Sequence, residues 1–188
     1  MRVNKYYSAL KLEDSSIITT IDPVKQLHAW VKEVDSKDQK FKLLWKGSRD
    51  GFTASKFHSN CDGKGPTLTV VQSTDGVIFG GYTSLSWNGN NSYYQDNAAF
   101  IYSITKGYKV SKQNNTDYSI DCHSGCGPVF GRGRDIAIQN NCNATNENFG
   151  TGVRSGGSTY KLPSGESFIA GTNKFTVKEI EVYSVIKQ

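Results

Sequence analysis

Near the start of the chain, hydrophobic residues recur with the spacing of an amphipathic helix. They are three or four residues apart and would share one side of that helix: Val24, Leu27, Trp30, Val31 and Val34. Asp22 and Pro23 come just before them; Asp is a favourable N-cap, and Pro suits the first helical position. The polar residues 35–38 end the pattern. The spacing therefore predicts a helix of about three turns that begins after Asp22.

After this helix, hydrophobic residues gather in short runs that are typical of β-strands. The runs cover residues 41–45, 68–71, 77–79, 98–104, 136–138 and 168–171. Asp75 and Gly76 separate the second run from the third, which predicts a tight β-hairpin. Residues 140–160 are rich in Asn and Gly, so we expect long surface loops there.

A second, shorter helix is predicted between the first two strands. Thr53 can cap its start, and Phe57 and Cys61 lie four residues apart, on the same side. Residues 46–51 precede this helix and contain two glycines among polar residues, so they are predicted to form a loop.

The last predicted strand changes its alternation part of the way along. Phe175 and Val177 occupy odd positions, whereas Ile180 and Val182 occupy even positions. A regular strand keeps one phase, because its side chains point alternately to the two faces of a sheet. We therefore expect a β-bulge or a change of sheet near residues 178–179, with all four hydrophobic side chains buried.

Together these elements indicate a mainly β protein of the α+β type. Many short strands, frequent turns and two short helices predict a β-sandwich with helices laid against it. The 188 residues fit one domain, and a hydrophobic fraction of 36% is sufficient for a core and excludes a wholly disordered chain. Residues 1–16 are polar and lack a clear period, so we predict an N-terminal arm followed by one domain at 17–188.

Charge and hydropathy narrow the classes of partner and the cellular location. The net charge of +5 is mild, and no run of five or more Lys or Arg occurs, so we predict no nucleic-acid partner. No apolar stretch approaches the roughly 18 residues that span a bilayer, so we expect no direct membrane insertion. The start of the chain leads into no apolar signal-peptide core, so we expect a cytoplasmic, intracellular protein.

Four cysteines are the first candidates for chemistry: Cys61, Cys122, Cys126 and Cys142. In a chain without a signal peptide we expect reduced thiols. Cys122 and Cys126 flank a short Gly-containing segment, but a second ligand pair at zinc-site spacing is missing. Their spacing also differs from the Cys-x-x-Cys of redox-active pairs. We therefore predict no metal and no cofactor, and we keep a redox role of these thiols as an alternative.

Two further motifs are compatible with chemistry but incomplete. His58 lies three residues before Cys61 on the short helix, and such a couple is a conceivable nucleophile and base, although no Gly-x-Ser-x-Gly motif is present. Residues 130–135 contain two Gly-Arg pairs, which invites a phosphate-loop interpretation. The motif matches neither standard phosphate-binding pattern, so a tight turn between strands is the preferred interpretation.

Acidic residues near the C-terminus are the remaining candidates. Glu179 and Glu181 lie two residues apart in the last strand, and Glu166 precedes them. Paired carboxylates can perform acid–base chemistry. A solvated face of the strand is the preferred interpretation, and a polar network under a loop or a functional acid are the alternatives.

Several sequence blocks, in matching order, closely resemble the TLDc domain family. They cover residues 43–52, Phe57-His58, 61–69, 78–84 with Trp87, Asp96, 99–103, 127–131, Asp135-Ile136, Ala170-Gly171 and 175–183. The resemblance runs from about residue 17 to 188. It implies a fold of two antiparallel sheets packed as a sandwich with short flanking helices. The family includes oxidation-resistance proteins and regulators of the vacuolar-type proton pump (V-ATPase), and no reaction is firmly attached to it.

The resemblance implies an interaction module that binds a protein partner, such as subunits of the V-ATPase, in oxidative-stress protection. The candidate binding residues lie in its matching blocks: Arg49, Asp50, Gly51, Phe79, Gly80, Gly81, Tyr82, Trp87, Glu179 and Glu181. For the first eight of these, a purely structural role is the competing interpretation. An enzyme or a direct thiol antioxidant is the main alternative function. A glycan-binding β-sandwich is a third possibility, because Trp87 lies among Asn-rich and Gly-rich loops.

Overall fold

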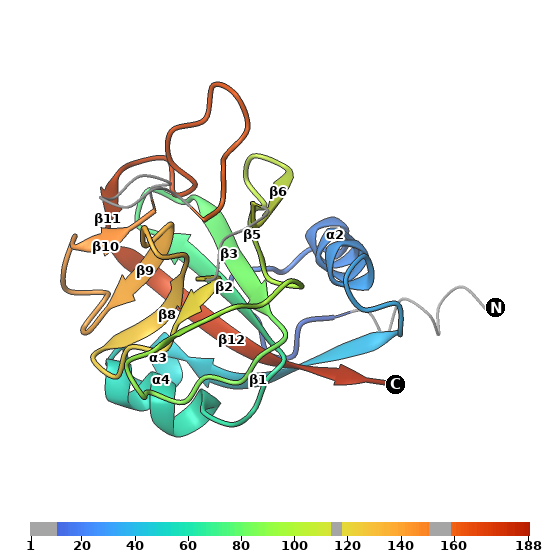
Figure 1. Cartoon of the computed structure of the whole chain (residues 1–188), viewed down its shortest axis with the longest axis horizontal. Coiled ribbons are helices and arrows are strands. Elements are labelled where there is room, and N and C mark those ends of the chain that lie inside the picture. The colour runs from blue at the N-terminus through green and yellow to red at the C-terminus, as the bar shows by residue number, and fades with distance from the viewer. Residues whose placement is uncertain (1–10, 114–117, 151–158) are drawn as a thin grey trace.

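The computed structural model describes residues 11–113, 118–150 and 159–188 of the chain. These residues form two antiparallel six-stranded sheets, which confirms the predicted mainly β sandwich with short helices (Figure 1). In the first sheet the order is β1 (Gln39–Lys46), β12 (Val177–Lys187), β2 (Thr67–Ser73), β3 (Ile78–Thr83), β5 (Phe100–Ser103) and β6 (Tyr108–Ser111). In the second sheet it is β11 (Lys174–Phe175), β10 (Asn148–Phe149), β9 (Ile136–Gln139), β8 (Cys126–Phe130), β7 (Ile120–Asp121) and β4 (Tyr93–Tyr94).

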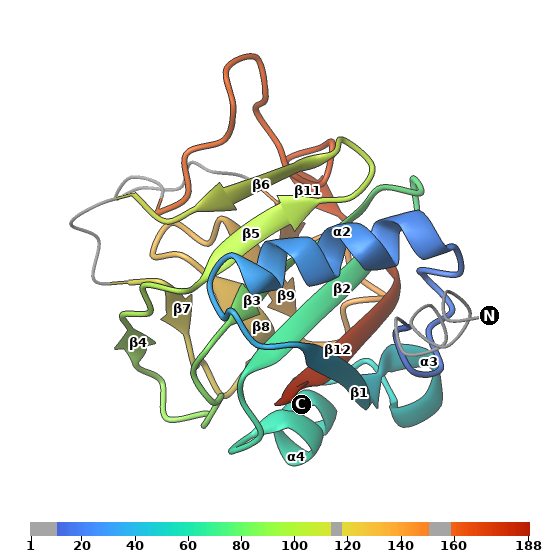
Figure 2. The same cartoon turned by 90° about the vertical axis from the view of Figure 1, so that its right-hand side faces the viewer.

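The first sheet is covered on both faces. Between the sheets, Phe79 and Ile101 of the first pack in one cluster with Phe130 of the second. On the other face, Leu27 and Val31 belong to a second buried cluster, which also holds side chains of β2, β5 and β12. These two residues come from α2 (Ile21–Lys32), which lies across that face (Figure 2). Strands of this sheet are therefore hydrophobic on both sides, as strands buried on both faces usually are.

The first helix begins earlier than the sequence pattern predicted. Thr20 is extended and occupies the N-cap position, so Asp22 and Pro23 lie within the first turn. Proline is tolerated there because the first amides of a helix have no intrahelical acceptor. The carboxylate of Asp22 is still near the positive end of the helix dipole. The prediction that Asp22 caps the helix was therefore wrong, and the N-cap lies two residues earlier, at Thr20.

Two elements lie between β1 and β2. Residues Gly47–Asp50, predicted as part of a loop, form the single helical turn α3 instead. The helix α4 (Ala54–Cys61) follows, and the Thr53 hydroxyl accepts a hydrogen bond from the amide of Lys56, as predicted. The hairpin between β2 and β3 is also confirmed, with Gly76 at φ +85° in its turn.

Two features of the C-terminal segment, a change of sheet and a bulge, account for its change of alternation. Phe175 pairs with Asn148 in the second sheet, whereas Val177 already pairs with Ser73 in the first. The pairing of β12 with β2 then shifts by one residue between Val177 and Glu179. The change of sheet and the bulge together bury all four hydrophobic side chains at 175, 177, 180 and 182, which confirms the prediction.

Two predictions about the late part of the chain were wrong, one wholly and one in part. Residues 168–171 form a turn rather than a strand, because the amide of Gly171 bonds back to the carbonyl of Phe168 and Gly171 has φ +82°. Ile169 beside it is buried all the same, so hydrophobicity there reflects packing and not extended backbone. In the predicted loops at 140–160, residues 140–147 form turns and bends as expected, but residues 148–149 form the short buried strand β10, and residues 151–158 lie outside the described residues. Among the described residues, no helix is long and apolar enough to cross a bilayer.

Candidate functional site

The two glutamates of β12 are buried. Glu181 is fully buried and Glu179 is 8% exposed, so the preferred interpretation of a solvated face was wrong. Alternation along a strand separates two faces, but in this sheet each face is covered by other elements. The alternative interpretation, a polar network beneath a loop, is the one the structure contains.

Glu181 is surrounded by donors from distant parts of the chain. Its Oε2 accepts hydrogen bonds from the hydroxyls of Ser15 (2.6 Å) and Tyr183 (2.7 Å). Its Oε1 accepts from the amide (2.7 Å) and the hydroxyl (3.1 Å) of Ser16. The Nζ of Lys46 lies 3.3 Å from the same oxygen. A buried carboxylate needs such partners, because leaving water costs several kcal/mol.

These contacts fasten the segment before α2 to the first sheet. Lys46 also donates to the backbone carbonyl of Asp14 at 3.0 Å, and Leu12 forms a parallel bridge with Phe41. Burial, together with the charge of Glu181, raises the pKa of the Tyr183 phenol well above its usual range, so Tyr183 stays a donor. Residues 12–16, predicted as part of an N-terminal arm, thus contact the domain directly, while residues 1–10 of that predicted arm lie outside the described residues.

Glu179 supports the turn that carries Arg49 and Asp50. Its Oε1 accepts from the amide of Ser48 at 3.1 Å and from the amide of Ile180 at 3.0 Å. The first of these contacts fixes α3 above the bulge of β12. The bulge thus aims one carboxylate at a neighbouring element, which is a common consequence of a bulge.

The Arg49–Gly51 block forms a compact charged turn at the surface. The guanidinium of Arg49 donates two hydrogen bonds of 2.8 Å to the carboxylate of Asp50 and one of 3.1 Å to the carbonyl of Leu44. These hydrogen bonds lower the pKa of the Asp50 carboxyl. Gly51 has φ +102°, and its carbonyl accepts from the indole of Trp45 at 3.0 Å. The Arg49 side chain is 48% exposed, so this turn reaches solvent.

The three aromatic candidates and the Gly80-Gly81 pair lie inside the molecule. Phe79, Tyr82 and Trp87 are at most 1% exposed. A methyl group on Gly80 would come within 1.9 Å of the Thr69 carbonyl oxygen, and one on Gly81 within 2.7 Å of the Phe130 ring. Both glycines therefore permit close approach of neighbouring groups, which is a structural role. Of the ten candidate positions, Arg49 and Asp50 offer charged side chains toward the surface.

All four cysteines are free and buried. Burial raises the pKa of the Cys122 thiol to about 11 and that of Cys142 to about 12. It also raises the pKa values of Cys61 and Cys126. The thiolate is the reactive form, so these environments disfavour thiol chemistry. Among the described residues, no group of three or more His, Cys, Asp or Glu is arranged to hold a metal ion.

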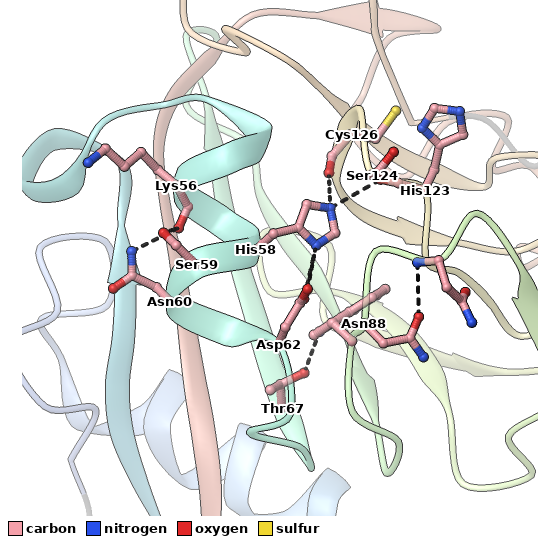
Figure 3. A network of polar contacts seen from close by, with 12 residues as sticks. Lys56, His58, Ser59, Asn60, Asp62, Thr67, Asn88, His123, Ser124 and Cys126 are labelled. Atoms are coloured by element: carbon pink, nitrogen blue, oxygen red, sulfur yellow. Dashed lines mark hydrogen bonds and ion pairs between the residues drawn. The ribbon is translucent and has the colours of Figure 1, made fainter.

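His58 joins α4 to the loop before β8 (Figure 3). Its Nδ1 lies 2.9 Å from the carboxylate of Asp62, and its Nε2 lies 3.1 Å from the carbonyl of Cys126 and 3.2 Å from that of His123. Both ring nitrogens thus have partners other than the Cys61 thiol, so the considered His58–Cys61 couple is replaced by a His58–Asp62 pair. The four-residue spacing of that pair on one helix was the available sequence signal.

Residues 130–135 contain the predicted tight turn between β8 and β9. Gly131 has φ +80°, and the amide of Arg134 bonds to its carbonyl at 3.1 Å. The amide of Arg132 is bound to the hydroxyl of Thr159 at 3.1 Å, so this amide is not free to cradle a phosphate. Asp135 is fully buried; one oxygen accepts from the Thr159 amide and the other has no partner in the described part of the chain. Burial raises its pKa to about 7.

Comparison with known proteins is consistent with this architecture. The sequence model of the TLDc domain matches residues 12–186. The mouse protein "MTOR-associated protein MEAK7" is 35% identical over 66 residues, which are 35% of this chain and 14% of that protein. The Xenopus laevis protein "TBC1 domain family member 24" is 24% identical over 96 residues, which are 48% of this chain and 17% of that protein. The matches thus span less than a fifth of these relatives.

Proposed function

Since the chain belongs to the TLDc domain family, we propose that it is a protein-interaction module without a catalytic site of its own. In this proposal it binds and regulates the V-ATPase or a related assembly in oxidative-stress protection, inside the cell. The name of the mouse relative, an mTOR-associated protein, supports the coarser statement that proteins of this family engage protein partners.

The observation that carries the proposal is the use of Glu181. This buried acid would be the natural general acid or base, yet its oxygens accept from Ser15, Ser16 and Tyr183 and face Lys46. A catalytic acid must reach a substrate atom at hydrogen-bond distance. Glu181 instead holds the start of the domain against β12. Its geometry therefore favours a rigid scaffold over a reaction centre.

The alternative of a thiol antioxidant receives less support. Peroxide-reducing cysteines are accessible and have a lowered pKa. Here each thiol is buried and its pKa is raised, above all by burial. Peroxide consumption by variants with each cysteine changed to Ser checks this point. A specific loss in one variant would favour the antioxidant.

Affinity capture on a purified V-ATPase V1 sector tests the proposal. We expect the immobilised sector to retain the whole chain, under at least one of several nucleotide and salt conditions. A chain truncated before Phe175 is the control for folding, because it lacks β12, which lies between β1 and β2. Retention of the folded chain and loss of the truncated chain would support the proposal.

A second bait separates the partner from the class of function. A purified mTOR complex is presented in parallel, since the relatives' printed name concerns mTOR. Binding to that complex but not to the V1 sector would overturn the V-ATPase assignment and leave an interaction module. Binding to neither bait under any condition would remove the support for both versions.

A further inference from the structure

The turn between β8 and β9 carries two arginines. Arg132 is exposed and Arg134 is half-buried. In the described part of the chain, neither guanidinium has an ion pair. Arg49, by contrast, is held by a bidentate contact with Asp50. Charge at the β8–β9 turn is thus available to a partner.

Two tyrosines lie beside these arginines and fix one of them. The Arg132 guanidinium carbon lies 4.7 Å from the centre of the Tyr118 ring, within the range of a cation–π contact. Tyr118 in turn meets Tyr93 edge to face, with ring centres 5.1 Å apart. Arg132 is therefore held over an aromatic ring, so less side-chain freedom is lost when it binds an anion.

The position of Tyr93 keeps this surface open at the edge of the second sheet. Tyr93 belongs to β4, the terminal strand of that sheet (Figure 2), and is 41% exposed, which is unusual for a large hydrophobic side chain here. Burial raises the pKa of the Tyr93 phenol and Asp121 adds to the rise, whereas Arg134 and Arg132 lower it. Both guanidinium groups therefore act on the same phenol. An edge strand also offers unpaired backbone groups.

We infer that Tyr93, Tyr118, Arg132 and Arg134, together called the Arg–Tyr surface, dock an acidic segment of a partner protein. Carboxylates would bind the two guanidinium forks, and an apolar or aromatic side chain would cover Tyr93. This inference rests on the proposed function and names the surface and the chemistry of the partner.

A protein segment fits this surface better than a nucleic acid does. Nucleic-acid affinity comes from several phosphate contacts, each made by a basic side chain. The net charge of the chain is only +5, and its basic residues are scattered. Two arginines with two tyrosines instead have the composition of a small interface centre, where Arg and Tyr are enriched.

Charge reversal at the surface, with a matched control, tests the inference. The test variant carries Arg132→Glu and Arg134→Glu. The control carries Lys40→Glu and Lys42→Glu, which make the same change of net charge at exposed positions on β1, in the other sheet. Arg132→Glu alone is a milder variant at an exposed position. Circular dichroism and thermal unfolding establish that each variant is folded.

Two probes are used with the full chain. The first is the purified V1 sector, and the second is a short fluorescent peptide of alternating Glu and Val, with a Lys–Val peptide for comparison. We expect the double Arg variant to bind the V1 sector and the Glu–Val peptide at least about tenfold more weakly, and the Lys control to stay within about twofold. The single variant should fall between them. Binding should also weaken as salt rises.

The outcomes separate this inference from the proposed function. If the wild-type chain does not bind the V1 sector but binds the Glu–Val peptide through the two arginines, the V-ATPase assignment is wrong and the inferred docking surface is supported. If the V1 sector retains the Arg variants as well as the wild type, the surface is overturned and the proposed function stands. Equal losses in the Arg and Lys variants would reveal only a general charge effect and overturn the inference. Arginine-dependent binding of a single-stranded RNA, without binding of the acidic peptide, would overturn it too.

Discussion

Two fully buried carboxylates show how differently one fold can accommodate an acid. Glu181 accepts hydrogen bonds on both oxygens and faces the ammonium group of Lys46. Asp135 accepts from the amide of Thr159 on one oxygen, while its other oxygen has no partner among the described residues. The first acid is compensated by donors from three parts of the chain. The donors near the second are backbone amides, and burial outweighs them and raises its pKa to about 7.

The contrast explains what each acid does for the domain. A compensated charge links elements, because its donors are lost if the elements separate. An acid that is poorly compensated adds little cohesion and instead makes stability depend on pH. Glu181 therefore acts as a structural link, whereas Asp135 makes the stability of the protein depend on pH.

The largest effect is expected from Glu181→Ala. The change leaves the hydroxyls of Ser15 and Tyr183 without their acceptor and the ammonium of Lys46, only 15% exposed, without its counter-charge. Removing one member of a buried pair usually costs about 3–5 kcal/mol. We expect a loss of that size in the free energy of unfolding, measured by urea denaturation.

Glu147→Ala is the matched control for this loss. Glu147 pairs with Lys174 at the surface, and its side chain is 55% exposed. Exposed pairs contribute about 1 kcal/mol or less, so this variant should unfold close to the wild type. Equal midpoints for the two variants would show that Glu181 is not the link described above.

An intermediate effect of opposite sign is expected from Asp135→Asn. The folded protein keeps the Asp135 proton up to about pH 7, whereas the unfolded chain releases it near 3.8. The free energy of unfolding of the wild type should therefore fall as pH rises between these values and level off above them. Asn cannot ionise, so the variant should gain stability relative to the wild type across this window.

The size of that gain follows from the shift in pKa. Each unit is worth about 1.4 kcal/mol, so the relative gain amounts to a few kcal/mol at most. Urea denaturation of both proteins at several pH values gives the difference in their free energies of unfolding. The titration of other groups cancels in this difference. A difference that is constant between acid and neutral pH would contradict the assignment of this window to Asp135.

The smallest effect is expected from Glu179→Gln. The hydrogen bonding of Glu179 is intermediate between that of Glu181 and that of Asp135. Glu179 accepts from the amides of Ser48 and Ile180, and Gln can still accept through its oxygen. The loss is then the charge assistance of these bonds, about 0.5–1.5 kcal/mol. Thermal unfolding of this variant measures the loss, and Glu33→Gln, a change at a largely exposed acid, serves as the comparison. A gain in stability would mean that the desolvation penalty of the buried charge exceeds the stabilisation from its hydrogen bonds.

Local features of the fold were predictable from the sequence. The phase change between Val177 and Ile180 required a bulge or change of sheet, because side chains of a strand alternate strictly. Thr53 marked the start of α4, and Asp75-Gly76 marked the hairpin, because each depends on neighbouring residues alone. Residues 168–171 were misassigned because a buried hydrophobic turn and a short strand have the same composition.

The environment of the candidate site depended on contacts that a local pattern does not contain. Ser15 and Glu181 are 166 positions apart, and nothing near either residue indicates the other. The resemblance to the family drew attention to Glu179 and Glu181 but not to their donors. Their burial was unexpected because alternation identifies a face, whereas the cover on that face comes from α2 and from the second sheet.

The place of β12 in the first sheet has a consequence for how the protein is made. This strand is the last along the chain, yet it lies between β1 and β2. On a ribosome that adds about 5–20 residues per second, the passage from β2 to the end of β12 takes on the order of ten seconds. Throughout that interval β1 and β2 both lack the strand that lies between them in the folded protein. The first sheet therefore cannot close until β12 has been synthesised.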